Sequence, residues 1–168
     1  MTPATLPVEA PPTVWPPRRA VTAWLFFDWS AQPFFTLVTT FVFAPFFASA
    51  LAKDAADGQA LWGYATGFAG LCIALLSPLL GGIADRTGPR KPWIAAFGAL
   101  LVIGSAMLWF AVPGSAAAVP IALAGFVIAT IGAEFATTFN NAMMTRLVPP
   151  ERLGWLSGTG WAIGYLGG

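Results

Sequence analysis

The chain has 168 residues, of which 57% are hydrophobic and only 9% are charged, with a formal net charge of +1, no histidine and one cysteine. Soluble domains carry roughly 25% charged residues, so the composition excludes an ordinary soluble domain and indicates a membrane protein. Without histidine, and with Cys72 isolated in an apolar run, the sequence predicts no haem, metal site or disulfide framework. We expect neither a cofactor nor a nucleic-acid partner.

The first segment is a proline-rich tail. Residues 1–17 contain many prolines and almost no charge, so we expect residues 1–19 to form a disordered cytoplasmic tail. The apolar stretch that follows Arg18 and Arg19 is too long and too aromatic for a signal peptide. We interpret the two arginines as an anchor that fixes the topology.

Three long runs without charge follow, at residues 29–52, 58–84 and 92–133. About 20 apolar residues cross a bilayer core, and the third run can cross twice with a turn near residues 113–115. We therefore predict an all-α, polytopic transmembrane bundle with four complete helices, over about 20–51, 60–84, 92–112 and 118–147, and the start of a fifth over 154–168. Residues 20–168 would then form part of an amino-terminal half, and we expect the chain to be the front part of a longer protein.

Lysine and arginine are divided unequally between the two ends of the predicted helices. Only Lys53 lies on one side. The other side carries Arg18, Arg19, Arg86, Arg90, Lys91, Arg146 and Arg152. The excess of positive charge predicts a cytoplasmic amino terminus in a multi-pass protein of the bacterial inner membrane or an equivalent membrane.

The loop sequence GGIADRTGPRK, residues 81–91, holds an acid that topology does not require. Positive charge at a cytoplasmic loop accounts for the basic residues alone, but not for Asp85 or for the flanking Gly81 and Gly88. A glycine in the last helical turn lets another helix approach closely, and Gly88 permits a tight backbone reversal.

Gly81-x-x-x-Asp85-Arg86-x-Gly88 followed by basic residues resembles the signature loop between helices two and three of the major facilitator superfamily of transporters. Pro89 stands where that family usually has a basic residue. Two further stretches, FFDWSAQPFF at 26–35 and NNAMMTRLVPPERLGWLSGTGWAIGYLGG at 140–168, are similar to the vacuole-effluxer-like branch, which includes the autophagy-related permeases. The resemblance implies two six-helix halves with the substrate between them, so the remaining helices of a longer chain would be partners of these.

The resemblance also implies a gate at the cytoplasmic seam between the halves. In the family the loop acid caps a helix or pairs across this seam, and a basic residue at the end of helix four joins it. The implied gating residues are Gly81, Asp85, Arg86, Gly88, Arg90 and Arg146. The alternative is that Asp85 is simply a solvated loop carboxylate.

Polar residues form a stripe on the predicted fourth helix. Thr130, Glu134, Thr137, Thr138, Asn141 and Thr145 are spaced by three, four or seven, which places them on one face. On the first helix Asp28, Gln32, Thr36 and Thr39 are expected to share a face. We expect these faces to line a cavity that forms a substrate or proton pathway through Asp28, Gln32, Thr130, Glu134, Thr137 and Asn141.

An acid inside a membrane costs roughly 2.5 to 3.5 kcal/mol on insertion scales, so Asp28 and Glu134 each call for a role. If the two share a cavity, either is a candidate proton carrier. The alternative is that each bonds to a neighbouring polar side chain and holds helices together.

The predicted fifth helix is rich in glycine. Gly160, Gly164 and Gly168 resemble part of the antiporter motif of the superfamily, but Tyr165 stands where that motif has proline. Close packing of helices through small residues is the simpler interpretation.

Together these features predict a secondary active transporter that moves a small solute across the lipid bilayer by alternating access. The branch implies an amino acid or related metabolite, and the buried acids suggest proton coupling. The alternative is a non-transporting assembly or sensor protein that keeps the fold, against which the polar stripes count. We expect no enzyme, because no nucleophile lies beside a base and no metal-ligand spacing occurs.

Overall fold

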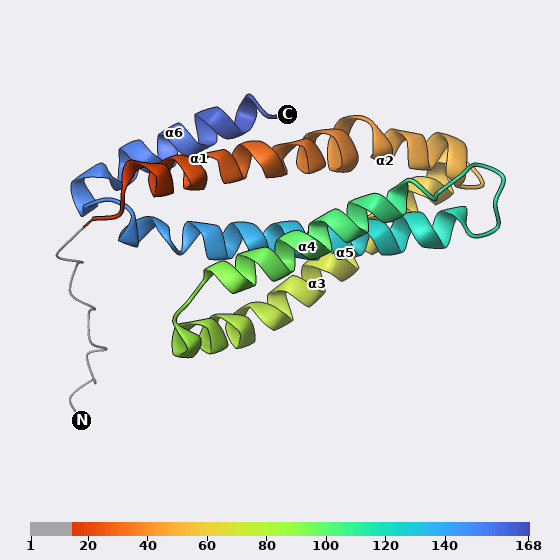
Figure 1. The fold of residues 1–168 in the computed structure, drawn as a ribbon. Coiled ribbons are helices and arrows are strands. Elements are labelled where there is room, and N and C mark those ends of the chain that lie inside the picture. The colour runs from red at the N-terminus through yellow and green to blue at the C-terminus, as the bar shows by residue number, and fades with distance from the viewer. Residues whose placement is uncertain (1–14) are drawn as a thin grey trace.

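Long apolar helices make up the computed structural model, which describes residues 15–168 (Figure 1). The described residues contain helices and no strand, so the prediction of an all-α bundle is confirmed. Four helical segments are long and apolar enough to cross a membrane: Arg18–Leu51, Ala55–Thr87, Lys91–Leu108 and Ala118–Arg146. The greater part of the predicted tail, residues 1–14, lies outside the described residues.

The first span is one continuous helix with two widened stretches. It comprises α1 (Arg18–Pro33), the π-helical η1 (Phe34–Phe41), α2 (Phe43–Phe46) and the π-helical η2 (Phe47–Leu51). Pro33 and Pro45 supply no backbone N–H, which interrupts the regular ladder. Beyond these prolines, backbone N–H groups donate to the carbonyl five residues earlier, not four. The N–H of Val42, for example, donates to the carbonyl of Leu37 at 2.9 Å. Side chains of η1 therefore do not follow α-helical spacing.

The same span begins earlier than the sequence suggested. Arg18 and Arg19 belong to α1, whereas the prediction placed both in the tail. The helix starts directly after Pro17, whose backbone is extended. Arginine is a good helix former, so the apolar helix extends back through both arginines to this proline.

The second span, α3 (Ala55–Thr87), begins five residues before its predicted start. The side chain of Asp54 accepts a hydrogen bond from the N–H of Asp57 at 2.8 Å, which caps the first turn. At the other end the helix passes Asp85 and stops at Gly88, whose φ is +78°. That backbone conformation favours glycine and turns the chain sharply into the next helix.

In the third and fourth spans, the α-helix ends before the predicted residue. α4 (Lys91–Leu108) gives way to turns before residue 112, and α5 (Ala118–Asn141) is followed by the 3₁₀ turns η3 (Met144–Arg146) and η4 (Pro150–Arg152). The end of this span tightens to 3₁₀ bonds such as Met143 N–H to the Asn140 carbonyl, as is frequent at the ends of α-helices. The last helix is α6 (Leu153–Tyr165).

The helices pack in two groups, which are connected by α5 and by the contact between α3 and η2. α4 lies along α5, α3 contacts α5, and α6 lies along α1 (Figure 1). Gly104, Gly125 and Gly132 bring α4 and α5 into backbone contact: a Cβ placed at Gly125 would lie 2.8 Å from the carbonyl oxygen of Gly104. Among the largest fully buried side chains are Phe47 of the first span and Phe126 of α5.

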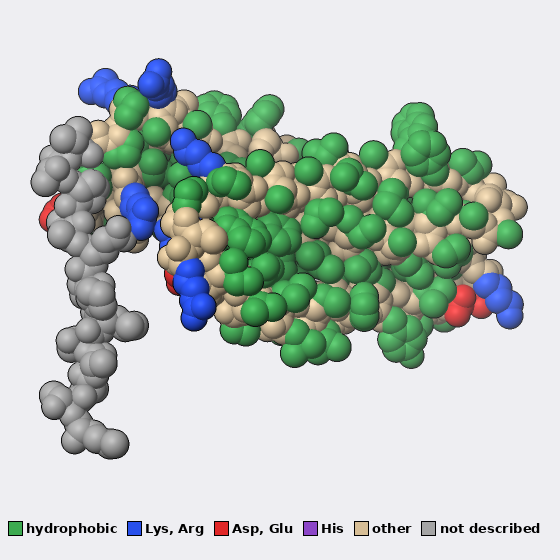
Figure 2. Space-filling model, turned by 60° about the horizontal axis from the view of Figure 1, so that its bottom comes forward, with side chains coloured by type: hydrophobic (Ala, Val, Ile, Leu, Met, Phe, Trp, Pro, Cys, Tyr) green, Lys and Arg blue, Asp and Glu red, His purple; other side chains and the backbone are tan. Residues whose placement is uncertain are grey.

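The surface matches a membrane environment. Figure 2 shows hydrophobic side chains over the long middle of the molecule and lysine and arginine mainly at one end. The termini of α1, α3, α4, α5 and α6 that carry the predicted cytoplasmic arginines meet at this end (Figure 1). Lys53 precedes α3 at the opposite end, beside Asp54.

Candidate functional site

A cavity of about 260 Å³ lies between α1, α5 and α6. Its lining includes Asp28 and Gln32 from α1 and Thr137 and Asn141 from α5. Four of the six residues predicted for a substrate or proton pathway therefore meet in one place. They come from helices that are about a hundred residues apart in the sequence, and the fold brings them together.

Asp28 is the charged group of this cavity. The residue is partly buried, and among residues 15–168 its carboxylate has neither a hydrogen-bond nor an ion-pair partner. Gln32, one turn further along, donates weakly to the Thr36 hydroxyl at 3.5 Å. A carboxylate without a protein partner inside an apolar span is free to interact with whatever enters the cavity.

Glycines on α6 allow this helix to approach Asp28 closely. A Cβ placed at Gly164 would lie 3.2 Å from the Cβ of Asp28, and one placed at Gly160 would lie 2.9 Å from the Trp24 ring. Gly168 lies against Gln32, where an added Cβ would be 2.8 Å from Cγ. The three glycines predicted as packing residues thus lie along one face of α1.

Thr130 and Glu134 lie outside the cavity lining. The Thr130 hydroxyl donates to the Phe126 carbonyl of its own helix at 2.8 Å. Glu134 is exposed, and its backbone carbonyl accepts from the Thr138 hydroxyl. Glu134 therefore does not meet Asp28 in this cavity within the described part of the chain.

Thr39 also falls outside the cavity, because the π-helical turns of η1 shift its position relative to α-helical counting. Its hydroxyl donates to the Phe34 carbonyl five residues back at 3.3 Å. The lining therefore includes Asp28 and Gln32 of the face predicted for the first span, but neither Thr36 nor Thr39.

Sequence reasoning missed three aromatic residues of the lining: Phe35, Trp161 and Tyr165. Trp161 and Tyr165 each follow a packing glycine of α6, and their ring centroids are 5.9 Å apart. The sequence did hold a signal for these two rings. Trp161 and Tyr165 are four residues apart, so they lie on one helix face, and each directly follows a glycine predicted as a packing residue.

At the charged end, Asp85 pairs with Arg90, the basic residue that follows the turn. Their Oδ1 and Nη2 atoms are 2.9 Å apart, and the side chains are 72% and 18% exposed respectively. Arg86 is exposed on the last turn of α3. At Gly81 no atom beyond the adjacent turns of its own helix lies within 4 Å of an added Cβ among the described residues, so the close helix contact expected there is not made within residues 15–168.

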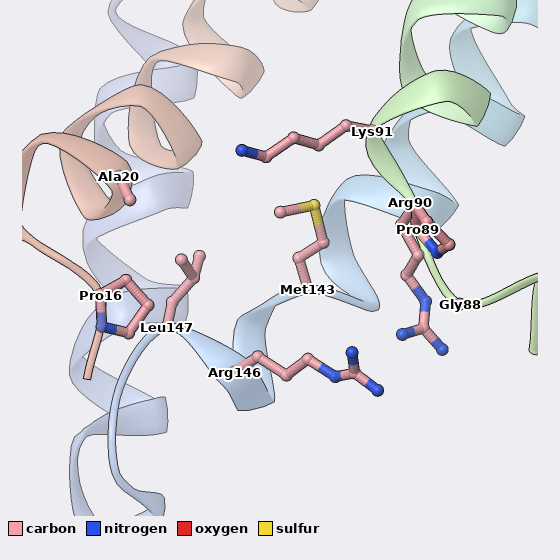
Figure 3. A pocket seen from close by; sticks show the side chains of 9 residues that line it. All are labelled: Pro16, Ala20, Gly88, Pro89, Arg90, Lys91, Met143, Arg146 and Leu147. Carbon is pink, nitrogen blue, oxygen red and sulfur yellow. The ribbon is translucent and has the colours of Figure 1, made fainter. Parts of the chain in front are cut away.

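Arg146 joins Arg90 around a second cavity, of about 330 Å³. Its lining combines the turn between α3 and α4 with the end of the α5 span and the start of α1: Pro16, Ala20, Gly88, Pro89, Arg90, Lys91, Met143, Arg146 and Leu147. Figure 3 shows Lys91, Met143 and Arg146 extending into the space between this turn and α1. The predicted loop residues and Arg146 therefore share one surface.

Comparison with known proteins establishes the family. The sequence model of the Major Facilitator Superfamily matches residues 2–168. The chain belongs to this superfamily. It is also 32% identical over 148 residues to the uncharacterized MFS-type transporter YxiO of Bacillus subtilis strain 168. That match covers 86% of the chain but 34% of the relative, so the chain spans about a third of the relative's length.

No solved structure matches the chain significantly. As a member of the major facilitator superfamily with four helical segments suited to crossing a membrane, the chain is a multi-pass membrane protein.

Proposed function

We propose that this chain is part of a secondary transporter that moves a small solute by alternating access, and that the cavity at Asp28 is its share of the substrate site. The observation that carries the proposal is the meeting of Asp28, Gln32, Thr137 and Asn141 around one cavity within apolar helices. Polar groups inside a membrane bundle mark substrate or ion pathways. Secondary transporters hold their substrates near the membrane midplane between such helices.

The turn between α3 and α4 is proposed as the cytoplasmic gate. Its support is the ion pair of Asp85 with Arg90, the sharp turn at Gly88 and the shared cavity with Arg146. A short ion pair that spans a turn is a contact that a moving partner helix can compete for. Gly81 and Arg86 complete the proposed gating set on the last turns of α3. We propose that the amino terminus lies on the same, cytoplasmic side, as the excess of positive charge at this end supports.

We also propose a proton pathway through Glu134 and Thr130 of α5 together with Asp28, in which the two acids act at separate positions and not in one cavity. Glu134 is exposed on α5 and lies outside the cavity lining, so its proton exchange would take place apart from the bound substrate. The similarity of residues 26–35 and 140–168 to the vacuole-effluxer-like branch supports amino acids or related metabolites as the first substrates to test.

The test is solute counterflow with the full-length protein that carries this chain, reconstituted in proteoliposomes. We expect labelled amino acid to accumulate in vesicles preloaded with unlabelled solute, and Asp28→Asn to lower this exchange at least about ten-fold. Ser30→Ala is the matched control, because Ser30 lies on the same helix outside the cavity lining and its hydroxyl donates to the Phe27 carbonyl. Equal exchange by wild type and Asp28→Asn would reject the cavity as the substrate site.

A further inference from the structure

The lining of the Asp28 cavity has a chemical character that its polar residues alone do not reveal. It combines one carboxylate with three aromatic rings and three neutral polar side chains, and no lysine or arginine of the described residues lines it. We propose that this cavity binds the positively charged ammonium group of a small organic cation. The inference rests on the proposed function in that it names the substrate class of the same site.

The Asp28 carboxylate supplies the charge for this recognition. It lines the cavity and is not neutralised by any side chain within residues 15–168. Opposite charges attract more strongly where water is partly excluded. The bare carboxylate therefore favours a cation over a neutral or anionic solute of the same size.

The aromatic rings supply a second, independent preference for positive charge. Trp161 and Tyr165 are 64% and 67% exposed, so much of their ring surface is not covered by other side chains. Their centroids lie 5.9 Å apart with the planes tilted by 52°. The faces of such rings attract cations within about 6 Å of the centroid, and quaternary ammonium groups are recognised in this way.

The packing of α6 holds these rings beside the acid. Gly160 and Gly164 bring the helix backbone against Trp24 and Asp28, where no larger side chain fits without displacement. Trp161 and Tyr165 follow these glycines directly and line the cavity with Phe35 of the first span. The carboxylate and the rings are thus set by a rigid helix contact.

The neutral polar groups suit the same ligand. The side-chain oxygens of Gln32, Thr137 and Asn141 are acceptors for N–H or O–H donors of a ligand. A substrate carboxylate would find no basic side chain here within residues 15–168. In a zwitterion, this cavity would therefore take the amino end.

The experiment compares isosteric probes by titration calorimetry with the purified full-length protein that carries this chain. Choline is compared with 3,3-dimethylbutan-1-ol, which replaces the charged nitrogen by carbon, and n-butylamine with butan-1-ol. We expect each cation to bind at least about ten-fold more tightly than its neutral partner. Equal affinities, tighter binding of the alcohols, or no detectable binding of either cation would overturn the proposal.

Substitutions at two positions of the lining locate the effect. Asp28→Asn, which keeps the shape of the side chain, should weaken choline binding at least about ten-fold and leave the alcohol unchanged. Trp161→Leu should weaken choline binding while Trp161→Phe largely retains it. Trp155→Leu is the control, since Trp155 is exposed on the same helix outside the cavity. Unchanged choline affinity in both Asp28→Asn and Trp161→Leu would refute the assignment, and the Trp161 pair decides it if Asp28→Asn does not fold.

Binding and counterflow separate this inference from the proposed function. Cation binding without counterflow would reject transport and keep the ammonium site. Counterflow of a neutral or anionic solute without cation binding would support transport and reject the ammonium site.

Discussion

The indole Nε1 of Trp24 donates a hydrogen bond to the backbone carbonyl of Asn140 at 2.7 Å, and this bond joins the first and fourth spans. Trp24 is 5% exposed and also packs against Gly160 of α6. The indole ring of Trp24 therefore joins α1, α5 and α6, one helical turn before Asp28.

Replacing Trp24 by phenylalanine should lower stability, because the hydrogen bond is lost and a smaller aromatic ring fills the buried site of the indole. The expected loss is about 1 kcal/mol, since the Asn140 carbonyl still accepts from the Met143 N–H. Thermal unfolding of the purified full-length protein measures this effect. Trp155→Phe, at an exposed position of α6, is the control, and an equal change in both variants would contradict the structural role of the bond.

The contact between α4 and α5 should tolerate no side chain at Gly132. An added Cβ would lie 2.7 Å from the Phe97 carbonyl oxygen, so Gly132→Val should force the helices apart at a cost of about 1 to 3 kcal/mol. Gly98→Ala on α4 is the matched control, because nothing lies within 4 Å of its added Cβ. That variant should gain stability through helix propensity. A Gly132→Val protein with the wild-type melting temperature would exclude the close contact.

Loss of the Asp85–Arg90 ion pair should change conformation more than stability. The Asp85 side chain is 72% exposed, so Arg90→Gln should alter the unfolding free energy by less than about 1 kcal/mol. If the proposed gate is correct, the same variant shifts the balance between inward-open and outward-open states. Labelling rates of a single cysteine at Thr145, with Cys72 replaced by alanine, report this balance. Arg152→Gln, at the same end but outside the turn, should leave the rates unchanged.

Glu134 should affect the pH dependence of transport without affecting the affinity of the Asp28 cavity, because it lies outside the lining. The proposed proton role predicts that uptake by the full-length Glu134→Gln protein no longer changes with pH as the wild type does. Choline binding should stay within about three-fold of wild type. A wild-type pH profile in this variant would remove Glu134 from the proton pathway.

The positions of the spans were predictable because charge-free runs of sufficient length leave few alternatives in a membrane protein. The end of the first span at Leu51 and the start of the fourth at Ala118 agree with the prediction. Other ends were not predictable, since they depend on local bonds. The Asp54 side chain caps α3 five residues before the expected start. The capping residue was visible in the sequence, since Asp54 is followed three residues later by Asp57. The predicted start of the helix followed the apolar run instead and therefore came too late.

Helical spacing predicted only part of the site, since Thr130 and Glu134 lie on the regular helix α5 and still fall outside the cavity lining. Asp28, Gln32, Thr137 and Asn141 lie on regular helices and line the cavity as a group. Thr39 does not, because η1 changes the residue spacing around the axis. The aromatic lining could not be deduced from one helix alone, since Trp161 and Tyr165 reach the cavity only through the packing of α6 on α1.

The two helices that meet at Gly88 differ greatly in length. α3 has 33 residues and α4 has 18, or about 50 Å and 27 Å at about 1.5 Å per residue. A hydrocarbon core of roughly 30 Å fits α4 almost upright, whereas α3 must tilt or project beyond it. The depth of the charged turn is therefore set by bilayer thickness, and thicker membranes should draw the end of α3 and its acid toward the headgroup boundary.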